Sequence, residues 1–479
     1  MTAARERTRE LFRQAVATVR AAPIPEPTLA PAFALPEAAG RAPRIGRGDV
    51  DGLPGDIWST ARAIEEGSVA PADVLAAAAA ATDRFDDLFH VFEARAEAAP
   101  PGTAGPLAGI PITVKDVIDA AGLPTRGSSE AVAPRLATQE AAAVSRLRAA
   151  GAVITGKVST HEFALGVTTP QSRNPWAPDR IPGGSSGGSA ISIVTGMALG
   201  SLGTDTRASI RVPAALCGLV GFKASFGVVP VDHWLTLSWT MDHLAPMARS
   251  VRDVALLMDV LAASGNRFRN CLPGDLAGAR FGWSPALVAG SSPGVAAVFR
   301  GAVSLLEAAG GRIVELAEPS DEDIDIANGA GMVVSRAEAA RFHAEYGTRV
   351  EAGTDEVRAQ LEEAAELLAT DYLRAFQLRG LLRARLEALF AEVDCLVMPT
   401  AKVVAPPRES AGEYLLVLSQ NCIPWSFVDF PAITLFAGLD GGLPVGLQLV
   451  GPPAGDELLL SLAHAAERVL PRPPRWSMP

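Results

Sequence analysis

Short apolar runs alternate with longer stretches of helical periodicity along most of the chain. Apolar runs bounded by turn residues are typical of strands buried on both faces, whereas apolar positions spaced three and four apart are typical of helices. The runs that predict strands are GIPITV (109–114), AVIT (152–155), CLVMPT (395–400), AITLFAG (432–438) and VGLQLV (445–450). The stretches that predict helices are 56–67, 71–85, 138–151, 250–265, 294–311 and 456–470.

This alternation predicts the fold class. Strands and helices that alternate over such a length indicate an α/β sandwich whose sheet is largely buried. Neither a repeat nor a second glycine- or proline-rich linker interrupts residues 107–470. We therefore expect one large domain in this part of the chain.

The N-terminal segment has a different pattern. Apolar residues between Leu11 and Val19 share one face of a predicted helix. Five prolines follow within residues 23–36, and proline favours an extended chain over a folded one. We expect residues 1–45 to form an appendage, a helix followed by a proline-rich extension, on a single domain that spans residues 46–479.

Composition and charge narrow the classes of function. The net charge of −11 argues against a surface for nucleic acid or anionic lipid. No apolar run is long enough to span a membrane, and charged residues near the start argue against a signal peptide. The four cysteines are far apart, and most of them lie in apolar surroundings, as buried thiols in a reducing compartment do. We therefore expect a cytoplasmic protein without a membrane or nucleic-acid partner.

Three polar segments are candidates for chemistry. Lys115 ends a predicted buried strand, and such strand ends face the ligand crevice of α/β folds, where desolvation lowers the pKa of an ammonium group. The segment IPGGSSGGSA (181–190) has the composition of a linker, but it runs into an apolar helical stretch and lies at no domain boundary. Ser209 follows a polar turn. Taken singly, such serines are most often turn or cap residues.

Other motifs give little support for a cofactor. GAVITGK (151–157) has the spacing of a phosphate-binding loop, but Val158 follows where serine or threonine would hold magnesium. We interpret it as a strand, a turn and the start of a helix. The chain has no GxGxxG fingerprint, and its six histidines lack the spacing of metal ligands. We expect neither a metal nor an organic cofactor.

The polar segments together resemble those of a known family. GIPITVKDVID (109–119), GGSSGGSA (183–190) and GTDTRASIRVPAALCGLVGFKASFG (203–227) resemble the amidase signature family of serine hydrolases. Other stretches follow in that family's order, among them GKVSTHEFALG, LAPMARSVRDVALLMDVL and FPAITLFAGLDGGLPVGLQLVGPPAGDELLL. The resemblance covers about residues 50–470 and implies an α/β/α sandwich around a large, mixed, mostly parallel, buried sheet.

The resemblance also implies a catalytic triad. By position, Ser209 is the expected nucleophile, Ser185 the bridging serine and Lys115 the base, with a cis peptide bond between Gly184 and Ser185. A serine hydroxyl is a weak nucleophile that needs an adjacent base. Neutral Lys115 would take a proton from Ser185 while Ser185 takes one from Ser209.

Further residues are expected to support this triad. Ser129 matches a family serine that forms a hydrogen bond near the lysine, and Asp205 is expected to order the loop rather than to titrate. The oxyanion is expected to be held by four backbone N–H groups, those of Thr206, Arg207, Ala208 and Ser209. The chain departs from the family here, because Arg207 and Ala208 replace the usual pair of glycines. We expect a working oxyanion hole beside a reshaped pocket.

The expected function is therefore that of a free-standing amidohydrolase, a monomer or homodimer. It would cleave the C–N bond of a small non-peptide amide, anilide or carbamate (urethane) through a seryl acyl-enzyme. Two alternatives remain: the glutaminase-type subunit of a tRNA-dependent amidotransferase, and a non-catalytic binding protein on the same fold. The intact Lys115, Ser185 and Ser209 argue against the second alternative.

Overall fold

The computed structural model describes residues 3–24, 55–97 and 104–476. In this part of the chain, one sheet contains eleven strands in the order β1-β5-β2-β6-β8-β7-β12-β13-β11-β9-β10. The bounds of these strands are β1 Phe92–Arg95, β2 Pro111–Lys115, β5 Val153–Val158, β6 Gly200–Asp205, β7 Val220–Lys223, β8 His243–Ala248, β9 Arg280–Trp283, β10 Arg312–Glu315, β11 Cys395–Pro399, β12 Ala432–Asp440 and β13 Leu443–Val450. A separate pair contains β3 (Pro124–Thr125) and β4 (Arg135–Leu136).

The sheet is mixed, as expected, and its parallel pairing is confined to two groups of strands. β5, β2 and β6 are parallel to one another, and so are β11, β9 and β10. The neighbouring pairs between these groups are antiparallel. The hairpin of β12 and β13 gives one reason for the antiparallel pairing. Gly441 and Gly442 both adopt positive φ angles and turn the chain straight back.

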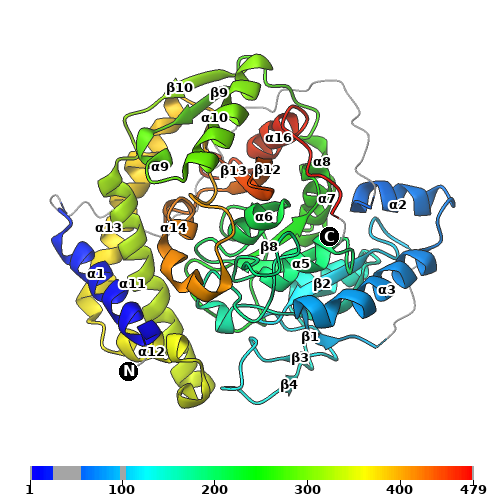
Figure 1. Cartoon of the computed structure of the whole chain (residues 1–479), viewed down its shortest axis with the longest axis horizontal. Coiled ribbons are helices and arrows are strands. Elements are labelled where there is room, and N and C mark those ends of the chain that lie inside the picture. Colours follow the sequence, from blue (N-terminus) through cyan, green and yellow to red (C-terminus); the bar gives the residue numbers. More distant parts are fainter. Residues whose placement is uncertain (1–2, 25–54, 98–103, 477–479) are drawn as a thin grey trace.

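Helices cover both faces of the sheet (Figure 1). Their bounds are α1 Ala3–Ala21, α2 Ile57–Glu65, α3 Pro71–Phe89, α4 Ala142–Ala149, α5 Gly187–Val194, α6 Arg211–Cys217, α7 Val251–Leu261, α8 Arg267–Asn270, α9 Pro285–Val288, α10 Pro293–Ala308, α11 Asp321–Tyr346, α12 Asp355–Ala365, α13 Ala369–Ala388, α14 Leu415–Ser419, α15 Ile423–Phe427 and α16 Asp456–Glu467. Short 3₁₀ turns lie at Glu162–Ala164, Val350–Ala352, Leu389–Ala391 and Arg408–Tyr414.

Alternate residues of one central strand show how the two faces are buried. Leu244 and Ala248 of β8 join the large core cluster that includes α7 and α16. Ala245 and Met247 face the other way and pack with α5 and α6. Since successive side chains of a strand point to opposite faces, the sheet lies between two helical layers. The α/β/α sandwich is confirmed.

The predicted strands and helices are confirmed with shifts of a few residues at their ends. The long helix α11 and its neighbours α12 and α13 were not predicted from the pattern. Four other helices pack against α11, namely α1, α12, α13 and α15, so its buried residues spread around the helix and leave no single apolar stripe.

The interpretation of the GAVITGK segment is corrected as well. No turn follows Gly156, because β5 continues through Lys157 to Val158. Buried Lys157 pairs with Asp116 at 3.2 Å.

The N-terminal helix α1 lies across α11, α12 and α13 (Figure 1). Arg20 near its end donates two hydrogen bonds to Asp371 of α13, at 2.8 and 2.7 Å. Most of the predicted proline-rich extension, and the domain boundary expected at residue 45, lie outside the described residues. None of the described helices combines the length and the apolar character that crossing a membrane requires.

Candidate active site

Lys115 lies at the carboxyl end of β2, fully buried. Its Nζ donates to Ser185 Oγ at 2.6 Å and to Thr204 Oγ1 at 2.7 Å. Burial lowers the pKa of Lys115 to about 7, against the opposing charges of Asp242 and Asp205. Near neutral pH, therefore, a large fraction of this lysine is uncharged and able to accept a proton.

The glycine–serine segment forms a tight loop before α5. The peptide bond between Gly184 and Ser185 is cis, as the resemblance implied. A Cβ atom on Gly184 would lie 2.7 Å from the backbone nitrogen of Thr168, and one on Gly188 would lie 2.6 Å from that of Ser159. Both approaches are too close for any side chain. The loop is therefore a packed part of the protein interior and not a linker.

Ser209 lies in the loop between β6 and α6, with a buried side chain. The backbone N–H of Ser186 donates to the carbonyl of Ser209 at 3.2 Å, and the Ser186 hydroxyl donates to the carbonyl of Thr204 at 3.3 Å. These bonds tie the Ser185 loop to the Ser209 loop. The structure thus brings Lys115, Ser185 and the Ser209 loop together from three separate parts of the chain.

The four backbone N–H groups expected at the oxyanion hole have a common property. None of those of residues 206–209 donates a hydrogen bond to another described residue. Thr206, Ala208 and Ser209 are nonetheless buried. Buried N–H groups almost always have a partner, so these groups are available for a ligand oxygen.

Arg211 fixes this loop from inside, a role that was not predicted from the sequence. Its fully buried guanidinium donates to Asp205, to the carbonyl of Arg207, and to Ser426 and Gln448 at 2.6 and 2.7 Å. The sequence signal for this role is a charged residue inside an apolar run, SIRVPAALCG. Such an arginine is buried together with the run, and a buried guanidinium needs hydrogen-bond acceptors on every side.

Asp205 connects several groups of this loop through its carboxylate. Its carboxylate accepts from the Arg211 side chain and from the backbone N–H groups of Ile210 and Arg211. Burial by itself would raise the pKa of Asp205, but the charge and hydrogen bonds of Arg211 lower it to about 2. Asp205 therefore stays ionised.

Ser129 is buried, and its described side-chain hydrogen bonds are with Glu162 and Ala131. Its hydroxyl donates to Glu162, whose carboxylate also accepts from the Thr354 backbone at 2.9 Å. No hydrogen bond joins Ser129 to Lys115 within the described part of the chain. The second partner of Lys115 is instead Thr204, from GTDT, a position that the residue pattern did not single out.

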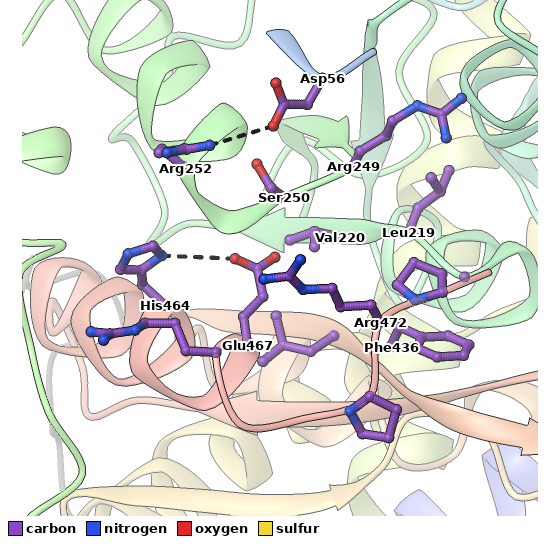
Figure 2. A pocket seen from close by; sticks show the side chains of 15 residues that line it. Asp56, Leu219, Val220, Arg249, Ser250, Arg252, Phe436, His464, Glu467 and Arg472 are labelled. Atoms are coloured by element: carbon purple, nitrogen blue, oxygen red, sulfur yellow. Dashed lines mark ion pairs between the residues drawn. The ribbon is translucent and has the colours of Figure 1, made fainter. Parts of the chain in front are cut away.

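One pocket reaches this loop and another lies apart from it. The first, partly open to solvent, is lined by Arg207 and by residues of α1, α11 and α12. The second lies where α7, α16 and the C-terminal segment meet (Figure 2). Two ion pairs lie within it, Arg252 with Asp56 at 3.5 Å and His464 with Glu467 at 3.7 Å. It contains none of the predicted site residues, so we place the candidate site at the first pocket.

Known proteins of similar sequence share most of the chain's length. The chain is 36% identical over 409 residues to one component of the glutamyl-tRNA(Gln) amidotransferase of Chloroflexus aurantiacus. That match covers 76% of this chain and 83% of the relative. The corresponding component from Thermotoga maritima has a solved structure with a TM-score of 0.77 and 28% identity, covering 88% of this chain and 96% of that one.

These relatives correct one expectation. Each is named as one subunit of a larger enzyme, and that enzyme's name includes a tRNA. The expectation of a monomer or homodimer without a nucleic-acid partner is therefore wrong. A negative net charge is a weak ground for that expectation, because one subunit of a complex need not contact the nucleic acid itself.

The family itself is shown by two further comparisons. The family model described as Amidase matches residues 74–460. A crystal structure described as an amidase superposes with a TM-score of 0.79 at 32% identity, covering 87% of this chain and 100% of that one. The chain therefore belongs to the amidase signature family of hydrolases that act on carbon–nitrogen bonds.

Proposed function

We propose that the chain hydrolyses a small amide through an ester formed on Ser209. The observation that carries this proposal is the contact of a buried, readily deprotonated lysine with Ser185, beside a loop whose N–H groups at residues 206–209 donate to no described residue. Such an arrangement supplies a base, a proton relay and an oxyanion hole, which are the parts that acyl transfer needs.

The steps follow from these groups. Ser209 Oγ attacks the amide carbon while its proton passes to Ser185, whose own proton passes to Lys115. The oxyanion accepts hydrogen bonds from the N–H groups of residues 206–209. The protons then return through Ser185 to the leaving nitrogen, the C–N bond breaks, and an ester remains on Ser209. Water attacks this ester by the same relay and restores the free serine.

The amide donor of an amidotransferase is the first candidate for this activity. The relatives at 34–36% identity are components of glutamyl-tRNA(Gln) amidotransferases, and each match spans more than four-fifths of the relative. On this candidate, glutamine is the amide, and the partners are a tRNA together with the other proteins of the complex.

A second candidate is hydrolysis of a non-peptide amide, anilide or carbamate without transfer to tRNA. Arg207 favours it, because a large side chain in place of the family's usual glycine reshapes the pocket that this residue lines. The solved amidase that matches along its whole length gives further support.

The two candidates differ in what stimulates the enzyme. The purified chain would be assayed for ammonia release from glutamine, alone and with the other amidotransferase proteins of its organism and glutamyl-tRNA(Gln). It would also be assayed on primary amides, p-nitroanilides and aryl carbamates. Glutamine hydrolysis that rises with the added proteins supports the first candidate. Turnover of another amide, without that stimulation, supports the second.

The pH dependence of kcat/KM follows from Lys115. Protonated Lys115 cannot accept a proton, so kcat/KM should rise with pH and level off above an apparent pKa near 7. Replacing Asp242 by asparagine removes a negative charge that raises the pKa of Lys115. The rise of kcat/KM should therefore move to lower pH. Rates measured between pH 5.5 and 9 on a neutral amide, in about 0.1 M salt, test both statements. A profile that is flat, or that falls with pH, would contradict the role of Lys115.

A further inference from the structure

Two arginines line the pocket beside the Ser209 loop. Arg207 is two residues before Ser209 in the chain, and Arg336 belongs to α11. The carbonyl of Arg207 accepts hydrogen bonds from Arg211 and Ser426, at 3.1 and 3.3 Å, so the backbone that bears this side chain is fixed.

Neither guanidinium forms an ion pair with a carboxylate among the described residues. The charge of Glu356 acts on Arg336 without such a direct contact. The Nε of Arg207 is buried without a hydrogen-bond partner. Arg336 is only 6% exposed, and its one described side-chain hydrogen bond is a long one, 3.4 Å, to the hydroxyl of Ser335. Arginines that are largely removed from water are otherwise almost always paired, because an unpaired charge is costly to desolvate.

The two charges also act on one another. Burial and the charge of Arg336 lower the pKa of Arg207, and burial lowers that of Arg336 to about 10 despite the charge of Glu356. Glu356 is the carboxylate among the described lining residues of this pocket, and it lies 3.7 Å from His161. Burial lowers the pKa of His161 and favours its neutral form. The pocket therefore keeps an excess of positive charge.

The rest of the pocket wall is largely apolar. Residues four apart on each of three helices face it: Thr8 and Phe12 on α1, Met332 and Arg336 on α11, and Glu356 and Gln360 on α12. Leu165, Val167, Leu415 and Leu416 complete the wall. These helices lie side by side (Figure 1). A largely apolar wall with two arginines suits a short carbon chain that ends in an anion.

We propose that the amide cleaved at Ser209 carries a carboxylate, which Arg207 and Arg336 bind together. The planar guanidinium fork matches a carboxylate, and two forks on one anion would balance the two unpaired charges. This inference rests on the proposed function, since it names the substrate class of the same site. It also explains the arginine at position 207, since the glycine usual in the family could not provide a positive charge.

Glutaramate and glutardiamide test the proposal, because they differ only at the end remote from the scissile amide, carboxylate in one and carboxamide in the other. The wild-type protein should have the higher kcat/KM on glutaramate. Arg336→Gln and Arg207→Gln should each lower the ratio of kcat/KM on glutaramate to kcat/KM on glutardiamide by about 10- to 100-fold. This is the usual effect of losing a charge-assisted hydrogen bond. Arg341→Gln is the matched control, since Arg341 is an exposed arginine of the same helix that pairs with Glu345.

A binding measurement separates the site from the chemistry. Ser209→Ala, which should not turn over, would be titrated calorimetrically with glutarate. Glutarate should bind, and the additional Arg336→Gln change should weaken binding at least tenfold. Circular dichroism would check that this variant folds. If it does not, the half-buried Arg207 provides the same test through Arg207→Gln.

The outcomes are distinct. Glutarate binding that depends on the arginines, without cleavage of any amide, would overturn the proposed reaction and leave the carboxylate site standing. Equal kcat/KM on the two amides, together with no glutarate binding at millimolar concentration, would overturn the carboxylate site and leave the reaction standing.

Discussion

Replacing Ser209 by alanine is expected to lower kcat by about 10⁴-fold or more while the protein stays folded. The variant loses the atom that forms the ester, and no other group in the relay can substitute for it. Ser209 Oγ forms no hydrogen bond among the described contacts, so its removal should cost little stability. Steady-state rates on the best amide of the panel, with thermal unfolding alongside, measure both effects.

A matched control is available on the adjacent strand. Ser201 of β6 is also buried, and its hydroxyl donates to the carbonyl of Thr113 at 3.1 Å. Ser201→Ala should therefore cost about 1 kcal/mol of stability and leave kcat nearly unchanged. Trapping the acyl group with hydroxylamine, followed by mass spectrometry, should locate the ester on Ser209 in the wild type. Comparable rates for Ser209→Ala and the wild type would rule out Ser209 as the nucleophile.

Removing Lys115 is expected to be the second largest loss. Lys115→Ala should lower kcat by about 10³- to 10⁴-fold, and Ser185→Ala somewhat less, because water can partly replace a bridging hydroxyl. The two side chains form one relay through a 2.6 Å contact, so the double variant should lose far less than the product of the single losses. Multiplicative losses would show that the two residues act independently.

Lys115→Met separates catalysis from folding, since methionine nearly preserves the buried volume. The folded protein lowers the pKa of Lys115 from 10.5 to about 7, so between these values the unfolded chain binds more protons than the folded one. The contribution of Lys115 to the free energy of unfolding of the wild type should thus increase as the pH rises from about 7 to 10.5. Lys115→Met should remain folded, and its stability relative to the wild type should be greatest below pH 7. If this variant is both inactive and unfolded, the pH dependence of kcat/KM is the test of the catalytic role of Lys115.

Much of the fold is determined locally. Strands such as GIPITV and VGLQLV are recognisable because both of their faces are buried, which requires nearly continuous apolar residues. Helix α10 is recognisable because its buried residues, from Val295 to Leu306, recur three and four positions apart, with Ser292 capping its start. Helix α11 lacks this contrast, since other helices surround it, and its pattern depends on neighbours that sequence order does not reveal.

The sequence by itself determined which residues are candidates for the triad, because their motifs and order resemble those of a family with defined roles. Only the tertiary structure decided what surrounds them. Ser129, expected to form a supporting hydrogen bond near the lysine, donates to Glu162, and Lys115 donates to Thr204 as well as to Ser185. Arg207 and Arg336 are far apart in the chain and share no motif. They line one pocket because a loop end and a helix face are packed together, and long-range packing of this kind leaves no periodic signal in either segment.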